Sequence, residues 1–440
     1  MLTRFFSLVD AIRGSLWFVP SVMTVAAVAL AFTTLWIDQE LIGSTSTNAT
    51  TWLYGGGADG ARDVLSTVAS SMITVAGVIF SVTVVALTLA SQQFGPRLLR
   101  NFMRDPGNQF VLGTFISVHL FCLIVLRAVR AEAAGGFVPH LSVSVALILA
   151  VAAAAVLIYF FHHATSSIRA SAVIAAVAEE LDGAIDRLFP EPVGRPGPLS
   201  VVQTEIERAG THIRLHQSGY LQAVDMDSLV SIAKTHDLVM RLDRRPGDFI
   251  TCECVVASVW PAERLSKDIA EQLNEAFLLG DERTAVQDLL FPAQQLAEMA
   301  VRALSPGTND PSTALACVDR LGAAFIRLAA RQVPSPYRYD DDHRLRITAD
   351  PVMLQELIAE TFNPIRQYGR TSVAVTVRLL ETIALSAPHV TSHEGLAELQ
   401  RQAIMIQRGS HGGLPEEWDR QVVEERFTSV QTALARRRAA

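Results

Sequence analysis

The chain has 440 residues, half of them apolar, and it carries 37 basic against 44 acidic side chains, a formal net charge of −7. This balance argues against a nucleic-acid partner, because phosphate binding needs a clustered basic face and the acidic residues gather in the second half of the chain. Its four cysteines do not form a disulfide framework, which favours a reducing compartment for the polar half.

Four apolar segments in the first part of the chain are each long enough to cross a bilayer, which takes about 20 residues. The first segment is too long for the apolar core of a signal peptide, which has about 7 to 15 residues, so we expect it to remain as a span. The predicted spans are 15–37, 65–91, 108–126 and 137–161, and together they form a transmembrane domain over residues 1–163.

The second apolar segment carries a row of small and hydroxylated residues in alternating steps of three and four. Such steps average close to one helical turn, so these side chains lie along one face of a helix. That face either packs closely against another helix or meets water, and the sequence leaves both alternatives open. The row consists of Thr67, Ser70, Thr74, Gly77, Ser81, Thr88 and Ser91, with Val84 as its one interruption.

Gly95 and Pro96 are predicted to end the second helix and to act as a hinge, because proline cannot continue a helix but fits the first position of a new one. The next segment alternates arginines with apolar residues. Its arginines share one face, and we expect them at the membrane interface. These interfacial residues are Arg97, Arg100 and Arg104.

The arginines next to the spans predict the orientation of the protein. With the N-terminus inside, six of them flank the cytoplasmic ends of the spans and three flank the outer ends, which favours both termini in the cytoplasm. We therefore expect a multi-pass protein of the cytoplasmic membrane with a cytosolic second half. The inner set is Arg4, Arg13, Arg97, Arg100, Arg104 and Arg169, and the outer set is Arg62, Arg127 and Arg130.

The polar half is predicted to be a cytosolic α+β domain that is mostly helical. Residues 164–200 are expected to hold an amphipathic helix over 166–188, which continues the fourth span, and then a linker rich in Pro and Gly. Residues 201–262 are predicted to form a small α+β module with strands over 212–225, on either side of a turn at 217–219, and over 238–242 and 249–259, and a helix over 226–235.

Residues 263–440 are predicted to be mainly helical. Asp310 is a suitable N-cap for one of these helices, with Pro311 at its first position. Asn363 and Pro364 are expected to break the helical region. Helices are predicted over 282–304, from 310, over 351–362, 371–385, 394–407 and 415–438, with a candidate strand at 345–347. The last helix, with Trp418, Val422, Phe427, Val430 and Leu434, is a candidate to pack on a partner subunit.

No common nucleotide, hydrolase or zinc signature is present, so we expect no enzyme, no catalytic residue, no metal and no cofactor. Cys252 and Cys254 would share a strand face, but two thiols without nearby partners favour core or chance over a metal site. The strand face of His212, Arg214 and His216 favours a solvated surface. His119, inside a span, favours a hydrogen bond to a neighbouring helix.

The run from Arg302 to Ala314, RALSPGTNDPSTA, resembles the signature of a bacterial family of predicted membrane proteins, catalogued as domain of unknown function 2254. Residues 80–94, 96–100, 218–222 and 245–249 are similar to further parts of the same pattern. The resemblance covers nearly the whole chain. It implies a multi-span inner-membrane protein, and it supplies no activity and no catalytic residue.

Two functions remain open. The first is a homo-oligomeric pore in the lipid bilayer, lined by the hydroxyl row and gated by the cytosolic domain. The second is a membrane-anchored scaffold or sensor whose cytosolic domain binds a protein or a small ligand. A third possibility, an enzyme acting on lipids, has no recognisable nucleophile and base. The candidate cytosolic binding residues are Arg245, Asp248, Ser305, Asn309 and Asp310.

The loop from Ser305 to Pro311 has two interpretations of its own. It places the free N–H groups of a helix start beside a Pro-Gly turn, and such a corner can hold an anion or a carboxylate. Alternatively it is only a capped turn between two helices. The second interpretation is the one we favour.

Overall fold

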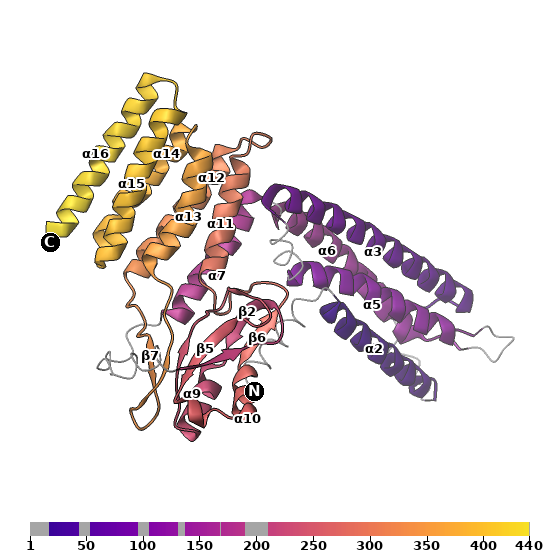
Figure 1. Cartoon of the computed structure of the whole chain (residues 1–440). Coiled ribbons are helices and arrows are strands. Elements are labelled where there is room, and N and C mark those ends of the chain that lie inside the picture. The colour runs from indigo at the N-terminus through magenta and orange to yellow at the C-terminus, as the bar shows by residue number, and fades with distance from the viewer. Residues whose placement is uncertain are drawn as a thin grey trace. The chain divides into compact units, whose positions relative to one another are not determined.

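The computed structural model describes residues 17–43, 53–95, 105–130, 137–167, 169–189 and 210–439 (Figure 1). The chain forms two compact units, and it passes from the first to the second between Arg169 and Ala170. Four helices of the described residues, all in the first unit, are long and apolar enough to cross a membrane. The predicted fold class, four membrane helices followed by a mostly helical domain with strands, is confirmed.

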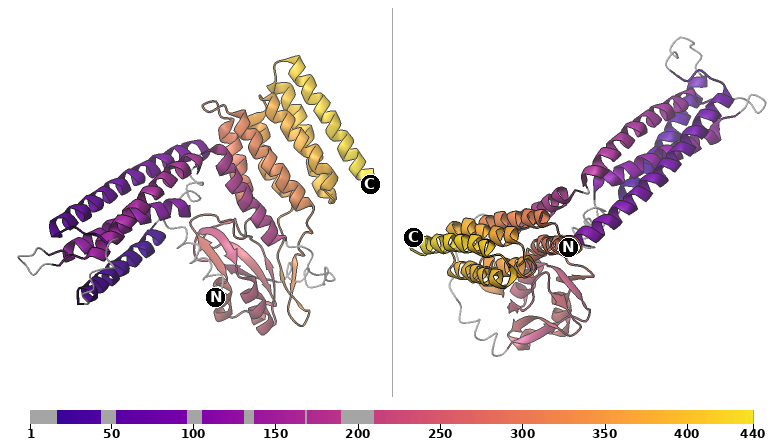
Figure 2. Two further views of the ribbon diagram at one scale, coloured as in Figure 1. Left: turned by 180° about the vertical axis from the view of Figure 1, so that it is seen from behind. Right: turned by 90° about the horizontal axis from the view of Figure 1, so that it is seen from above.

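The membrane unit is a bundle in which one helix occupies the centre. Half of the apolar window of α5 is buried, against 17 to 22% for the other three helices. α5 packs on each of the other helices, which run alongside it in Figure 2. Gly113 allows the close approach of α2, because a Cβ atom there would meet Met23 and Pro20. The helices are α2 (Phe18–Gly43), α3 (Ala58–Phe94), α5 (Pro106–Ala128) and α6 (His140–Ser167).

The amphipathic helix after the fourth span is a separate helix, α7 (Ala170–Leu188), and not a continuation of α6. Its apolar stripe is buried in the second unit, where α7 packs on α11 (Leu290–Ala303) and α12 (Pro311–Ala329). This burial explains the difference from the prediction, since the apolar stripe packs on helices of the second unit. The buried apolar residues of α7 include Ile174, Val177, Leu181 and Ile185.

Two small sheets follow. The larger sheet has the strand order β1-β5-β3-β8-β7 and the smaller has β4-β2-β6. Their apolar faces share a core with α9 (Met226–Thr235) and α10 (Lys267–Asn274). The strands are β1 (Thr211–Arg214), β2 (Gly219–Val224), β3 (Val239–Leu242), β4 (Phe249–Ile250), β5 (Val255–Trp260), β6 (Phe277–Gly280), β7 (Tyr337–Tyr339) and β8 (Leu345–Thr348).

The single strand predicted over 249–259 is wrong, because the chain turns after Ile250 and its two parts join different sheets. β4 pairs with β2, whereas β5 pairs with β1 and β3. In the turn between them Glu253 has a φ of 68° and its N–H donates to the carbonyl of Leu215 at 3.1 Å. Cys252 and Cys254 therefore lie in a turn and do not share a strand face.

The last four α-helices of the chain, α13 to α16, lie side by side in Figure 1. The helix predicted from 282 begins only at Leu290, because the Asp288 carboxylate accepts the N–H groups of Leu290 and Phe291 and so caps it there. The break predicted at Asn363 and Pro364 is also wrong, since α13 runs through it. These helices are α13 (Leu354–Gly369), α14 (Val373–Ser386), α15 (His393–Gly413) and α16 (Glu417–Ala439).

The last helix is packed within its own chain. α16 contacts α14 and α15, and Val430 and Leu434 are buried there. These two residues are consequently not available to a partner subunit. Trp418, at the start of the same helix, is 74% exposed.

Arg346 of β8 is a buried cation that lies between two carboxylates. Its Nε donates to Asp340 at 2.7 Å and its Nη1 to Asp237 at 2.9 Å. The hydrogen bonds from Arg346 and Arg264 lower the pKa of Asp237. Burial works to raise the pKa of Asp340, but hydrogen bonds from the Arg344 N–H and from Arg346 leave it lowered as well.

We expect the stabilisation by this cluster to be present above the ordinary aspartate pKa of about 3.8 and to be lost as the pH falls through the lower pKa values of the folded state. The midpoint of thermal unfolding of the second unit should therefore begin to fall only below about pH 5, and should fall less steeply for D237N than for the wild type. D227N, at an exposed aspartate, is the control. Parallel curves for wild type and D237N would contradict the assignment.

Candidate functional site

One face of α3 is buried, and it is built from small side chains. It packs on α5 and α6 through a stripe in which four of six residues are alanine. Alanine at these positions allows the helix axes to come close, as small residues do in membrane bundles. The stripe consists of Ala61, Leu65, Ala69, Ala76, Ile79 and Ala86, each exposed by at most 4%.

The predicted hydroxyl row lies on the other side of α3. At about 100° per residue, it is turned by roughly 150° from the buried stripe. Thr67, Ser70, Thr74, Gly77, Ser81 and Thr88 are all exposed, and Ser91 is half-buried. At Gly77 a Cβ atom would meet nothing within 4 Å. None of the described helices of this chain covers the row. Within a single copy, the row therefore does not pack against another described helix.

The hydroxyl groups of the row are suited to an apolar environment. Thr74 Oγ1 donates to the carbonyl of Ser70 at 2.8 Å, and Thr88 Oγ1 donates to that of Val84 at 2.9 Å. These two hydroxyls thus have a partner inside their own helix, while their oxygens can still accept a hydrogen bond. Large apolar side chains flank the row and are exposed, among them Val78 and Val85. The face is therefore a polar strip between two apolar ones.

The end of α3 is as predicted, and the residues after it are not part of the description. The helix ends at Phe94, and Gly95 follows with a φ of 105°, a conformation that favours glycine. The Gly95 N–H donates to the carbonyl of Ser91 at 3.0 Å and closes the last turn. The second hinge residue, Pro96, and the interfacial Arg97, Arg100 and Arg104 lie outside the described residues.

His119 bonds two membrane helices together. Its Nδ1 lies 2.8 Å from the carbonyl oxygen of Ala69, so that α5 is linked to α3 in the middle of the bundle. The interpretation as a hydrogen bond to a neighbouring helix is confirmed. A donor that meets a carbonyl in this position avoids the cost of an unpaired polar group in hydrocarbon.

Arg245 and Asp248 lie in the turn between β3 and β4. The Arg245 N–H donates to the Asp248 carboxylate at 3.1 Å, and the Arg245 guanidinium pairs with Glu356 of α13. Gly247, in the same turn, has a φ of 101°, and a Cβ atom there would overlap the Asp288 carboxylate. The turn is thereby fixed against the starts of α11 and α13.

Ser305, Asn309 and Asp310 form a capped turn between α11 and α12. The Asp310 carboxylate accepts the N–H of Thr313 at 3.2 Å and its hydroxyl at 2.6 Å. This hydroxyl bond, followed by the N–H bond, lowers the pKa of Asp310. Asn309 has a φ of 46°, and its N–H donates to the carbonyl of Ser305. Because Asp310 already occupies the helix start, an external anion would have to compete with a carboxylate.

The structure does not bring these two sets of candidates together. Arg245 and Asp248 lie beside the start of α11, whereas Ser305 follows its end. A helix of 14 residues is roughly 21 Å long, so the two sets are separated by that distance. Only Arg245 and Asp248 line the cavity described next.

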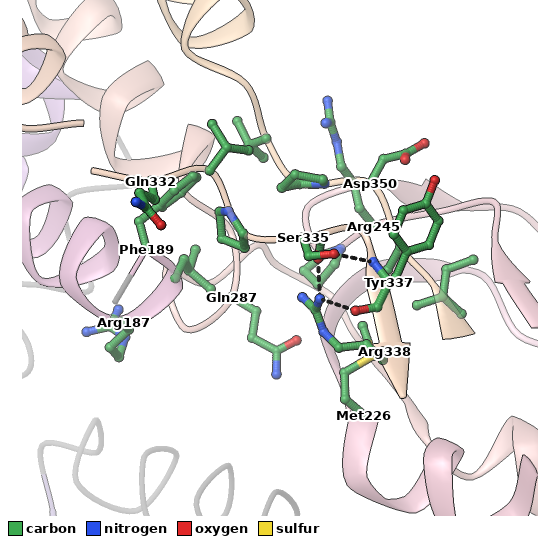
Figure 3. A pocket seen from close by; sticks show the side chains of 18 of the residues that line it. Arg187, Phe189, Met226, Arg245, Gln287, Gln332, Ser335, Tyr337, Arg338 and Asp350 are labelled. Atoms are coloured by element: carbon green, nitrogen blue, oxygen red, sulfur yellow. Dashed lines mark hydrogen bonds between the residues drawn. The ribbon is translucent and has the colours of Figure 1, made fainter. Parts of the chain in front are cut away.

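A cavity of about 1440 Å³ in the second unit was missed by sequence reasoning (Figure 3). Five segments supply most of its wall, with single residues from α9 and from the loop before α15. These segments are the end of α7, the turn from β3 to β4, residues 286–287 before α11, the stretch from the end of α12 through β7, and the loop from β8 to α13. No motif marks these segments, because each contributes only a few residues from distant parts of the chain. The lining residues include Ser335, Tyr337, Arg338 and Tyr339.

The other side chains considered from the sequence do not form a site. Within the described ranges, no group of three or more His, Cys, Asp or Glu side chains could hold a metal ion. His212, Arg214 and His216 are exposed, as a solvated face requires. Of the two turn cysteines, Cys252 is exposed and donates weakly to the carbonyl of His216.

Comparison with known proteins gives one family and a few relatives. A family model described as "Predicted membrane protein (DUF2254)" matches residues 13–384. Uncharacterized proteins of Mycobacterium bovis and of two Mycobacterium tuberculosis strains are each 30% identical over 428 residues, which are 96% of this chain and 81% of the relative. No solved structure matches.

Proposed function

This chain belongs to the family of predicted membrane proteins known as domain of unknown function 2254, and from that premise we propose that it assembles into a homo-oligomeric pore. In this proposal the α3 helices of several copies surround a path across the cytoplasmic membrane. The hydroxyl row lines the path, and the cytosolic unit gates it. The observation that carries the proposal is the exposure of the row along a span of 32 residues.

The three faces of α3 support such a ring. The alanine stripe packs on the rest of its own bundle, and the row on the opposite side is left for the axis of the assembly. The apolar flanks, which include Val78 and Val85, are then available to neighbouring copies or to lipid. Rows of serine and threonine hydroxyls offer water and ions hydrogen-bond acceptors that an aliphatic wall lacks.

The ends of the proposed path follow from the sequence. The sequence predicts a bend at Gly95 and Pro96, and in this proposal Arg97, Arg100 and Arg104 would lie at the inner mouth, where they would favour anions. The excess of arginine beside the inner ends of the spans supports the orientation with both termini in the cytoplasm. We assign no enzymatic activity to the chain.

A membrane-anchored sensor is the second candidate function, and one observation favours it. The cavity in the second unit is large enough for a small ligand, and Arg245 and Asp248 lie in its wall. In a sensor the α3 rows of adjacent copies would pack on each other closely and leave no path.

Thiol accessibility tests the pore directly. In full-length protein with Cys252 and Cys254 replaced by serine, we expect T74C, S81C and T88C to react with a charged, water-soluble thiol reagent. The matched controls V78C and V85C, on the apolar flank, should not react. Cys317 can stay, because burial raises the pKa of its thiol to about 12 and leaves almost no thiolate. The buried Cys122 can stay as well.

Purified protein in planar bilayers should also pass ions, and modification of the S81C and T88C variants with the thiol reagent should reduce the current. Unreactive row cysteines together with silent bilayers would refute the pore. If oxidation then joins these cysteines into disulfides between copies, the row is a packing face, as the sensor requires.

A further inference from the structure

The cavity of the second unit is large enough for a small-molecule ligand. Pockets for small molecules commonly measure about 300 to 1,000 Å³, and this one reaches about 1440 Å³. Its walls come from several loops, one turn and the end of α7, all within the same compact unit. A molecule as large as a nucleotide therefore fits, with water around it.

Arg338 supplies a half-buried cation to this cavity. Its guanidinium donates to the carbonyls of Ser335 and Tyr337 (Figure 3). Among the described residues no carboxylate pairs with it, and burial alone lowers the pKa of Arg338. Removing a guanidinium from water without an anion is costly, because carbonyl dipoles replace only part of its hydration. The remaining N–H groups suit a phosphate or carboxylate.

The charged residues of the cavity wall also favour an anionic ligand. Five arginines line the cavity against three aspartates. Arg245 pairs with Glu356 and Arg331 with Asp186, so both are neutralised within the protein. Within the part of the chain that is described, the others have no carboxylate partner. These are Arg187, Arg244 and Arg338, whereas two of the aspartates, Asp243 and Asp248, already accept hydrogen bonds from the protein.

The wall also offers an apolar surface and a hydroxyl. Val286 and Val333 are each 48% exposed and line the cavity, an arrangement that leaves apolar area open to water. The hydroxyl of Tyr339, another lining residue, is buried and has no hydrogen-bond partner. A buried hydroxyl of this kind is satisfied when a ligand supplies an acceptor.

We propose that this cavity binds a phosphorylated organic molecule of about the size of a nucleotide. Its phosphate meets Arg338, with Arg244 at the rim, and its organic part covers Val286 and Val333. The site lies wholly within the second unit, so it does not depend on whether the membrane unit forms a pore. If the pore exists, the site is a natural place for the ligand that controls it.

Calorimetric titration of the full-length protein in detergent tests the site with defined probes. ATP, AMP and glucose 6-phosphate represent phosphorylated organic molecules. Adenosine is the control without a phosphate, and inorganic phosphate is the control without an organic part. We expect at least one of the three phosphorylated probes to bind ten times more tightly than either control. Tighter binding of ATP or AMP than of glucose 6-phosphate would assign the organic part to an aromatic base.

Variants then assign the binding to this cavity. R338M should weaken the binding at least tenfold, and R338K, which keeps the charge, should lose less. V333D adds a negative charge at an exposed position of the wall and should weaken the binding without lowering the unfolding temperature. R320M, at an exposed arginine of α12 outside the cavity, is the matched control and should bind as the wild type does.

The proposal is overturned if none of the three phosphorylated probes binds. It is also overturned if R338M and V333D bind as tightly as R320M. Should R338M fail to fold, the binding of the probes to V333D and R244M tests the proposal instead. Both positions are exposed, so these variants should fold. The readout is binding, so silent bilayers leave it unaffected and the two proposals can fail separately.

Discussion

Replacing Asp288 by alanine is expected to lower the free energy of unfolding of the second unit by about 3 to 5 kcal/mol, the usual cost of removing one partner of a buried ion pair. The side chain of Asp288 is 3% exposed, and its carboxylate lies 2.7 Å from Arg283 Nη2. Burial raises the pKa of Asp288, while Arg283 and the N–H groups of Phe291 and Leu290 work against this rise.

The effect is large because one carboxylate serves three purposes. It balances the charge of Arg283, it caps α11, and it fills the space beside Gly247 in the turn from β3 to β4. Arg283 also donates to Gln294, and the Gln294 amide donates to Glu360 at 2.9 Å. Removing the carboxylate therefore leaves a mostly buried cation without its carboxylate partner and weakens the packing of the turn from β3 to β4 against the start of α11.

Unfolding of the full-length protein by urea in detergent, followed in the second unit, measures this loss. D281A, at an exposed aspartate of the same loop, is the matched control and should change the free energy by less than about 0.5 kcal/mol. The double variant R283M/D288L should recover much of the loss, because it removes both charges. Equal stability of D288A and D281A would show that the ion pair contributes nothing.

Replacing Asp38 by alanine is expected to destabilise the membrane unit by about 2 to 4 kcal/mol, since charged acceptors with several donors contribute most among hydrogen bonds. Asp38 is a buried residue of α2, and its carboxylate accepts the N–H groups of Leu141 and Ser142, each at 2.9 Å. It also accepts the Ser142 hydroxyl at 2.7 Å. Two helices far apart in sequence are joined in this way.

The loss at Asp38 follows from the free N–H groups at the start of α6. Without the carboxylate these N–H groups stay unpaired in a buried position, where water cannot serve as the hydrogen-bond acceptor in place of Asp38. E40A, at an exposed acid two residues further along α2, is the matched control. Resistance to unfolding by sodium dodecyl sulfate should fall for D38A, fall less for D38N, and stay unchanged for E40A. A D38A protein as resistant as E40A would contradict the role of the cap.

Much of the membrane unit and several local elements could be predicted from sequence. The apolar segments appear as helices, and α3 ends where Gly95 predicts it. In the second unit the predicted helix over 226–235 is α9, and Asp310 caps α12 with Pro311 at its first position. These features depend on neighbouring residues alone, such as an apolar run, a cap or a proline, and a local pattern is sufficient to reveal them.

Other elements depend on partners that a local pattern does not contain. The alternation across 249–259 is typical of one strand, yet Glu253 turns the chain toward Leu215 and divides it between two sheets. The helical pattern from 282 is overridden by Asp288, which bonds to Arg283 and starts α11 late. Pro364 stays inside α13, so the strong preference of proline against a helix interior is outweighed by the burial of the residues around it.

The sequence by itself determined that this is a membrane protein with a row of hydroxyls along its second span, because hydropathy and helical periodicity are properties of consecutive residues. Only the tertiary structure decided that the row is left uncovered by the described helices of its own chain, while alanines on the opposite side are buried. It likewise brought Arg338, Arg244 and Val286 to one cavity. Proximity between distant segments is set by packing, and no spacing along the chain records it.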